Sequence, residues 1–366
     1  MKPRVLTLLP SLEVGGIERV SLSLVRALGA RFDFTTVAFD RDGPLRGEFD
    51  AAGSETIILR RRPGVDIAYP PRLARVIRDV RPDLVHCHNE TALFYGRFAA
   101  GLARVPAVVY TEHDRRFPGR PRLALLNRAL GRTCRRLVTV SKRLRDELAA
   151  HEGFDRARIR VIRNGVDGGP FEISPSRASV LEEFGLQADT NLVVSVGRLS
   201  PEKGLDRIIA AAPAISFAVP SARFLIVGGG AERRRLEASA DPAIVRFAGE
   251  RGDVPRLMTS ADLVVIPSRS EGLPLAALEA AAASRATVAT DVGALSEVIE
   301  DGVTGRLVPS GDGSRLVGTV CALLADAPLR TDMGRRARTR FEETFSLERM
   351  AREYEEVYLE SMGRAC

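Results

Sequence analysis

Aromatic residues make up only 5% of the 366 residues of this chain, and tryptophan is absent. Base-stacking surfaces for single-stranded nucleic acids are therefore scarce. No apolar run reaches about 18 residues, so we expect no transmembrane helix. The cysteines show no paired spacing, which favours free thiols in a reducing cytoplasm over a disulfide framework. They are Cys87, Cys134, Cys321 and Cys366.

The chain also lacks internal repeats, low-complexity tracts and a recognisable signal peptide, since the first apolar run, at 5–9, is too short for a signal core. A chain of this length, with 45% hydrophobic and 28% charged residues, is typical of a soluble protein with two domains. These features predict a cytoplasmic globular protein with a sizeable core.

Lysine is scarce among the basic residues. Of the 54 lysines and arginines, only Lys2, Lys142 and Lys203 are lysines. Lys203 and Arg198 follow an apolar, β-branched run at 191–196 and precede a predicted helix. A compact ammonium group in so arginine-rich a chain indicates a specific task, and two cations between a strand and a helix are well placed to neutralise a diphosphate. A solvated loop lysine is the alternative.

The stretch at 270–279 places two glutamates, Glu271 and Glu279, around Gly272 and Pro274. It follows an apolar run typical of a buried strand, and Pro274 suits the first turn of a helix because its missing N–H would be unpaired there. Glu271 would then lie in a strand-to-helix turn, where free N–H groups and the helix dipole favour an anion. Two carboxylates beside an anion site suit a nucleotide sugar, with its phosphates and hydroxyls. A capped surface helix with two solvated acids is the alternative.

Apolar and helical patterns alternate along the chain, which predicts parallel sheets with crossover helices and therefore an α/β fold. Predicted helices occupy 17–28, 71–80 and 91–102, and a further helical pattern begins at 205. Predicted strands occupy 5–9, 35–39, 56–59, 84–88, 107–111, 137–140, 159–162, 192–196, 224–227, 245–248, 263–266 and 287–289. A segment rich in glycine, proline and serine at 168–176 separates two series of strands, and we place the domain boundary near residue 170.

The carboxyl ends of the first-domain strands are the expected ligand edge of such a sheet. Gly15 and Gly16 follow the first strand, where a backbone without side chains either approaches a phosphate or sugar or makes a plain turn. The G-x-G-x-x-G dinucleotide pattern is missing. His86 and His88 alternate on one predicted strand and share a face. A metal site is one interpretation, and a place for His88 beside an acceptor is the one we favour.

Several motifs, in their order and spacing, make the chain resemble the GT-B glycosyltransferases, in particular the retaining family GT4. The matching stretches are 194–199 with 201–204, 224–230, 261–268, 271–279, and 297–299 with 302–305. The resemblance implies two Rossmann-like, doubly wound parallel-sheet domains that face a central cleft. It divides the chain into an acceptor-binding domain at 1–170, a nucleotide-sugar-binding domain at 171–346, and a last helix at 347–366 that returns to the first domain.

The resemblance also implies roles for individual residues, in a reaction that needs no metal and no cofactor. Arg198 and Lys203 would stabilise the diphosphate leaving group, Glu271 would contact the donor sugar, and Glu279 would bind the ribose. His113 would contact the transferred sugar, with a purely structural histidine as the alternative. Further donor contacts would come from Gly15, Gly16, Gly197, Gly249, Gly272 and Leu273, and acceptor-side contacts from His88 and Asn164. A plain turn is the alternative for the last of these.

Charge is uneven along the chain, whose formal net charge is +7 at pH 7. Residues 1–170 are strongly basic, and the remainder is slightly acidic. Arginines are densest at 115–137, a stretch without acids in which leucines recur at helical spacing. A basic amphipathic helix is typical of binding to an anionic membrane surface, and a solvated arginine-rich face is the alternative. We expect no nucleic-acid partner, because no helix-turn-helix, zinc-finger or RNA-binding signature accompanies the arginines.

We therefore predict a retaining hexosyltransferase that moves a sugar from a UDP- or GDP-sugar to a saccharide or lipid-linked saccharide, in polysaccharide or glycolipid biosynthesis. It would act in the cytoplasm, and at the inner face of the cytoplasmic membrane if the arginine-rich stretch binds lipid. The alternatives are a nucleotide-sugar epimerase and a non-catalytic sugar-nucleotide-binding protein of the same fold. An epimerase would act on the donor alone, and a non-catalytic protein would not need the full set of cations and glutamates.

Overall fold

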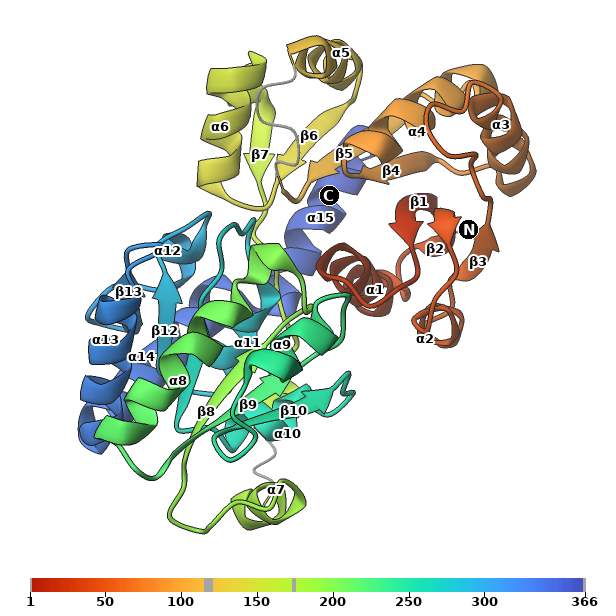
Figure 1. Cartoon of the computed structure of the whole chain (residues 1–366). Coiled ribbons are helices and arrows are strands. Elements are labelled where there is room, and N and C mark those ends of the chain that lie inside the picture. The colour runs from red at the N-terminus through yellow and green to blue at the C-terminus, as the bar shows by residue number, and fades with distance from the viewer. Residues whose placement is uncertain (1, 115–120, 173–175, 365–366) are drawn as a thin grey trace. The chain divides into compact units, whose positions relative to one another are not determined.

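The computed structural model describes residues 2–114, 121–172 and 176–364. The chain divides into two compact units: unit 1 comprises residues 1–165 and 347–366, and unit 2 comprises residues 166–346. Figure 1 shows that each unit is built around one parallel sheet flanked by helices. The boundary at 165/166 lies a few residues before the one that the composition suggests.

Unit 1 contains a seven-stranded sheet in the order β3-β2-β1-β4-β5-β6-β7, in which every neighbouring pair is parallel. Its strands are β1 (Arg4–Ser11), β2 (Asp33–Arg41), β3 (Glu55–Ile58), β4 (Leu84–His88), β5 (Ala107–Glu112), β6 (Arg136–Thr139) and β7 (Ile159–Val161). All were predicted from the sequence, because strands with helices on both faces are near-continuous apolar runs.

Helix α15 completes unit 1 although it lies at the end of the chain. It packs against α1 and β5, and it buries Tyr354, Val357 and Tyr358, which share one face at helical spacing. The helices of unit 1 are α1 (Gly16–Leu28), α2 (Arg46–Ala51), α3 (Tyr69–Val80), α4 (Glu90–Ala103), α5 (Pro121–Gly131), α6 (Lys142–Glu152) and α15 (Leu347–Ser361).

Unit 2 contains a six-stranded parallel sheet in the order β10-β9-β8-β11-β12-β13. Its strands are β8 (Asn191–Val196), β9 (Ala222–Val227), β10 (Val245–Gly249), β11 (Leu263–Ile266), β12 (Thr287–Thr290) and β13 (Gly305–Val308). Its helices are α7 (Arg177–Glu183), α8 (Leu205–Ala218), α9 (Arg233–Ser239), α10 (Val254–Thr259), α11 (Leu275–Ala282), α12 (Leu295–Val298), α13 (Gly313–Ala325) and α14 (Ala327–Thr344). Strand β13 was not predicted. The two sheets confirm the predicted α/β fold class.

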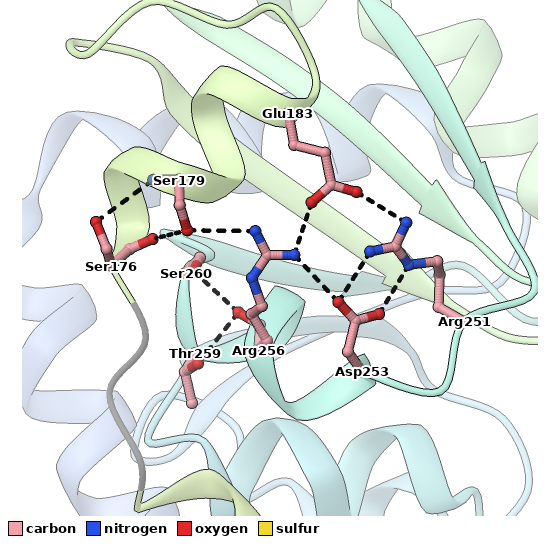
Figure 2. A network of polar contacts seen from close by, with 8 residues as sticks. All are labelled: Ser176, Ser179, Glu183, Arg251, Asp253, Arg256, Thr259 and Ser260. Carbon is pink, nitrogen blue, oxygen red and sulfur yellow. Dashed lines mark hydrogen bonds and ion pairs between the residues drawn. The ribbon is translucent and has the colours of Figure 1, made fainter.

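A network of four charged side chains ties α7 to α10 and the loop before it (Figure 2). Glu183 accepts hydrogen bonds from Arg251 and Arg256, and Asp253 accepts from the same two arginines. The hydrogen bond from Arg251 is the main cause that lowers the pKa of Asp253 to about 2. The network thus fixes the first helix of unit 2 through ion pairs.

The arginine-rich stretch is not one continuous helix, so this part of the prediction was wrong. Helix α5 ends at Gly131, the chain turns, and β6 begins at Arg136. Cys134 and Leu137, which follow the leucine spacing in the sequence, are buried in the core of unit 1 instead of lining an outer helical face. Of the arginines in the stretch, Arg115, Arg116 and Arg120 lie outside the described residues. Within the described ranges, no helix is long and apolar enough to cross a membrane.

Candidate active site

The strand order of unit 2 reverses between its two central strands, since the chain runs outward from β8 through β9 and β10 and then returns to β11. Ligands of open α/β sheets bind at the carboxyl ends of the strands at such a point. The loop after β8 carries Arg198 and Lys203, and the loop after β11 carries Glu271. The structure therefore places these predicted site residues at the edge where a ligand is expected.

Lys203 and Glu271 form an ion pair at this edge. The Lys203 Nζ atom donates to both carboxylate oxygens, at 2.8 Å from Oε1 and 2.7 Å from Oε2. The Ser268 hydroxyl also donates to Oε1, at 2.6 Å. The Glu271 side chain is 5% exposed and the Lys203 side chain 25% exposed, so the carboxylate is nearly removed from water while the ammonium still reaches it.

Close approach of the two loops creates this ion pair. Gly204 has a φ of 61°, and a side chain there would overlap the carbonyl oxygen of Pro267 at the end of β11. Arg207 donates to the carbonyl oxygens of Pro267 and Ser268, at 3.3 Å each. Arg269 in turn pairs with Asp206 through two hydrogen bonds of 2.7 and 2.6 Å. Lys203 is therefore held beside the β11 loop by the backbone and by two arginines.

A second glycine fixes Glu271 from the other side. Gly293 has a φ of 57°, and a side chain at this position would overlap the backbone oxygen of Glu271. The N–H of Ala294 donates to the carbonyl oxygen of Gly272, at 3.1 Å. Helix α11 begins just beyond, with Pro274 as its N-terminal cap residue. The positive end of its dipole and its first N–H groups therefore lie close to the Glu271 loop.

The other predicted residues of unit 2 occupy different parts of the same edge. Arg198 is exposed in the loop after β8, next to Gly197. Glu279 is half-buried on α11, Leu273 is buried in the loop before it, and Gly249 ends β10, which is two strands away from β8. Among the predicted donor residues of unit 2, Gly249 therefore lies on the strand farthest from the Lys203–Glu271 pair.

In unit 1, histidines gather at the carboxyl ends of β4 and β5. The Nδ1 atom of His88 lies 2.9 Å from Nε2 of His113, and the two rings meet edge to edge, with centroids 5.1 Å apart and planes inclined by 23°. The ring of His86 lies 3.9 Å from that of His88, as expected for one face of a strand. The Nδ1 atom of His86 is hydrogen-bonded to the hydroxyl of Tyr358 and its Nε2 atom to the hydroxyl of Thr111, both at 2.8 Å.

A metal does not fit His86, because both of its ring nitrogens already have hydrogen-bond partners. Burial lowers the pKa of His86 to about 3, so the ring is neutral at neutral pH. In the part of the chain that the structure describes, no group of three or more histidine, cysteine, aspartate or glutamate side chains is arranged to hold a metal ion.

The buried carboxyl group of Glu112 fixes the loop that carries His113. It accepts hydrogen bonds from the backbone N–H groups of His113 and Asp114, at 3.0 and 3.4 Å, and from the Tyr110 hydroxyl. Burial is the main cause that raises the pKa of Glu112 well above its ordinary value, and the charge of Glu90 adds to it. Sequence reasoning identified His113 but not the carboxyl group beside it.

The remaining predicted residues of unit 1 are Gly15, Gly16 and Asn164. The Glu18 carboxylate lies against Gly15 at the start of α1, where it accepts from the Ser11 hydroxyl at 2.9 Å. The anion-favouring end of α1 therefore already contains a carboxylate. Gly16 is exposed, with open space where a side chain would lie. Asn164 is buried close to the boundary with unit 2.

Two doubly wound sheets, the second with a cation and a carboxylate at its switch point (the place where the strand order reverses, between β8 and β11), define a protein of the GT-B class of glycosyltransferases. The chain belongs to this enzyme family by sequence as well. The profile described as Glycosyltransferase Family 4 matches residues 14–168, and the profile described as Glycosyl transferases group 1 matches residues 177–340.

Individual proteins support the assignment. A glycosyltransferase of Methanocaldococcus jannaschii is 30% identical over 77% of this chain and 77% of its own length. An Escherichia coli UDP-Gal:alpha-D-GlcNAc-diphosphoundecaprenol alpha-1,3-galactosyltransferase is 24% identical over 95% of this chain and 94% of its own. The crystal structure of Anabaena HepE with UDP-glucose shares the fold, with a TM-score of 0.86 at 22% identity over 98% of this chain and 99% of that one.

Proposed function

We propose that this glycosyltransferase is a retaining hexosyltransferase that uses a nucleoside diphosphate sugar as its donor. The observation that carries the proposal is the Lys203–Glu271 pair at the switch point of unit 2, beside the start of α11. This arrangement offers a diphosphate a cation and helix N–H groups, and it offers sugar hydroxyls a carboxylate acceptor.

Binding of the donor would separate Lys203 from Glu271, so that each side chain contacts a different part of the ligand. Lys203, together with the exposed Arg198, would turn to the diphosphate, whose bridging oxygen gains negative charge as the bond to the sugar breaks. The released Glu271 carboxylate would accept hydrogen bonds from the sugar hydroxyls. Glu279, half-buried on α11, would bind the ribose.

The proposed step needs no protein nucleophile. The acceptor hydroxyl forms a bond to the anomeric carbon on the face from which the diphosphate departs, and the departing phosphate oxygen takes the hydroxyl proton. Configuration at the anomeric carbon is then retained. His113 would contact the transferred sugar and Asn164 would lie on the acceptor side, whereas the fully buried His88 would act through His113 instead of touching the acceptor.

The relatives bear on the donor and the acceptor. The E. coli relative is named for a UDP-sugar donor and a lipid diphosphate acceptor, and the HepE crystal contains UDP-glucose. We therefore propose a UDP-sugar ahead of a GDP-sugar, and a lipid-linked saccharide as acceptor, in polysaccharide or glycolipid assembly at the inner face of the cytoplasmic membrane.

Exposed apolar side chains on two packed helices of unit 1 support contact with such a membrane. Phe98 and Leu102 lie one turn apart on α4 and are 46% and 54% exposed, and Leu125 on α5 is 66% exposed. The neighbouring Arg122 and Arg132 are exposed as well. Apolar side chains within a basic surface suit an anionic bilayer, which attracts each nearby cation by about 1 kcal/mol.

Product analysis tests the reaction. The protein is incubated with UDP-glucose, UDP-galactose or GDP-mannose and a lipid diphosphate saccharide, and the anomeric configuration of the product is read by NMR. Transfer with an α-linkage is expected from one of the donors. An inverted linkage would refute the retaining mechanism, and conversion of the donor without any acceptor would identify an epimerase instead.

Calorimetry separates the two glutamates. Glu279→Ala should weaken binding of the free nucleoside diphosphate, because it removes a ribose contact. Glu271→Ala should lose sugar transfer without weakening that binding. Equal losses of affinity in both variants would show that the roles are wrongly assigned, and full binding without transfer in the parent would favour a non-catalytic protein.

A further inference from the structure

Three of the four histidines of this chain are buried together, and their protons are constrained by what each ring nitrogen contacts. His88 is fully buried, and this burial lowers its pKa well below the ordinary value, so its ring is neutral at neutral pH. A neutral imidazole carries one proton, on either Nδ1 or Nε2. The position of that proton decides the state of the neighbouring His113.

The two nitrogens of His88 have unequal surroundings. Nδ1 lies 2.9 Å from Nε2 of His113, whereas the buried Nε2 of His88 has no hydrogen-bond partner among the described residues. With the proton on Nδ1, His88 donates to His113 and leaves only a lone pair unsatisfied. With the proton on Nε2, the same contact would be made in the opposite direction, but an N–H group would be buried without an acceptor. Orphaned buried N–H groups are rarer than unsatisfied acceptors, because a buried donor without a partner loses its hydrogen bonds to water and gains none in return.

We propose that His88 is a positioning residue that donates from Nδ1 to His113 and thereby holds His113 as the neutral tautomer protonated on Nδ1. The inference deepens the proposed function and rests on it for the role of His113 in transfer. The position of His113 is supported by its edge-to-edge contact with His88 and by Glu112, which accepts a hydrogen bond from its backbone N–H.

The tautomer matters for the chemistry that His113 would perform. Glycosyl transfer passes through a transition state with positive charge at the anomeric carbon. An imidazolium at His113 would repel this charge, and its Nε2–H would force the proton of His88 onto the orphaned Nε2. A neutral ring at His113 adds no positive charge beside the anomeric carbon.

Nitrogen-15 NMR measures the tautomer directly. The full-length protein is labelled with ¹⁵N-histidine, which gives four rings, and His113→Gln and His151→Gln identify the signals of the replaced residues by difference. At pH 7.5 we expect a protonated Nδ1 and a bare Nε2 for both His88 and His113. A proton on Nε2 of His113, alone or as an imidazolium, would overturn the proposal. This readout needs no donor, so it holds whether or not the proposed transfer is found.

Variants of His88 connect the tautomer to turnover. The side-chain amide of Asn places an N–H close to the position of Nδ1, so His88→Asn should keep the His113 tautomer and most of the turnover. His88→Leu removes the donor, so His113 should shift towards Nε2 protonation and kcat should fall about 10-fold with little change in KM. Equal turnover in the Leu and Asn variants, with an unchanged His113 spectrum, would show that His88 serves packing alone. If His88→Leu does not fold, the spectrum of the parent still decides the tautomer.

Discussion

Replacing Lys203 should cost more stability than replacing Glu271, because the two side chains of the ion pair differ in exposure. Lys203→Met leaves a carboxylate that is 5% exposed with only the Ser268 hydroxyl as a partner among the contacts described above. Breaking a buried pair costs about 3–5 kcal/mol, and a hydrogen bond to a charged group contributes about 1.5–3 kcal/mol. Since the ammonium is 25% exposed, we expect a loss of about 2–3 kcal/mol.

Glu271→Gln should cost less, about 1 kcal/mol, because the partly exposed ammonium of Lys203 finds water instead. The double variant should cost less than the two single variants together, with a coupling energy of about 2 kcal/mol. For a unit of this size, each kcal/mol corresponds to about 2–4 °C in Tm. Lys203→Met should therefore lower the Tm of unit 2 by about 4–12 °C.

Two experiments measure these differences: differential scanning calorimetry, and urea denaturation monitored by far-UV circular dichroism. Circular dichroism is used because the chain contains no tryptophan for fluorescence. Lys142→Met, an exposed lysine in unit 1, is the matched control and should change stability by less than about 0.5 kcal/mol. Strict additivity in the double variant would refute the view that the two side chains stabilise each other.

The same variants test ligand binding. Glu271→Gln removes the anion that competes with a diphosphate for Lys203, so the affinity for a free nucleoside diphosphate should rise about 3- to 10-fold. Lys203→Met should lower it. A Lys203→Met protein that binds the nucleoside diphosphate as tightly as the parent does would refute the placement of the diphosphate at this pair.

Three further predictions concern other parts of the chain. Asp253→Asn should destabilise the protein by about 1 kcal/mol at pH 7, and no more than this because the Asp253 side chain is 35% exposed. In urea titrations, the difference from the parent should vanish as the pH falls from 3.8, the ordinary pKa, through about 2, the pKa of Asp253 in the folded protein. Ser284→Gly should stabilise by about 0.5–1 kcal/mol, because this residue has a φ of 58° just after α11. Phe98→Ser with Leu125→Ser should release the protein from anionic vesicles in a sedimentation assay.

Each of the three has a matched control. Asp253→Asn should cost much less at pH 2 than at pH 7 if the effect is the lost charge, so a constant difference would contradict the linkage. Ser284→Ala keeps the unfavourable backbone conformation and should not stabilise. Binding of the parent to anionic vesicles should weaken with added salt, and a double serine variant that sediments as the parent does would leave this face as ordinary solvated surface.

The sheets could be predicted from the sequence because their central strands are buried on both faces and therefore apolar throughout. Strand β13 escaped prediction, since Gly305–Val308 is short and contains an arginine. The spacing of Cys134 and Leu137, by contrast, predicted a helix where the structure has none. Their positions match a helical period, but the chain turns after Gly131 and brings both side chains into the core, which a periodicity in one segment does not reveal.

The positions of the candidate residues at the strand ends could be predicted from the sequence, but the contacts among them could not. Strand ends and helix starts located Lys203 and Glu271, because those features are local in the sequence. Their ion pair depends on the approach of Gly204 to Pro267, which only the packing of β8 beside β11 brings about. The role of Ser268 and the pairing of Asp206 with Arg269 depend on the same packing and left no recognisable signal in the sequence.

The last helix has a consequence for the order in which the protein acquires its structure. Tyr354 and Tyr358 of α15 contact Thr111 and His86, so the histidine cluster of unit 1 is assembled only with residues from the end of the chain. On the ribosome, the sheet of unit 1 waits for a helix that is synthesised only after the whole of unit 2, while unit 2 is made in one uninterrupted segment. Unit 2 is then the first to be able to fold, and unit 1 remains open to chaperones and proteases until α15 has emerged.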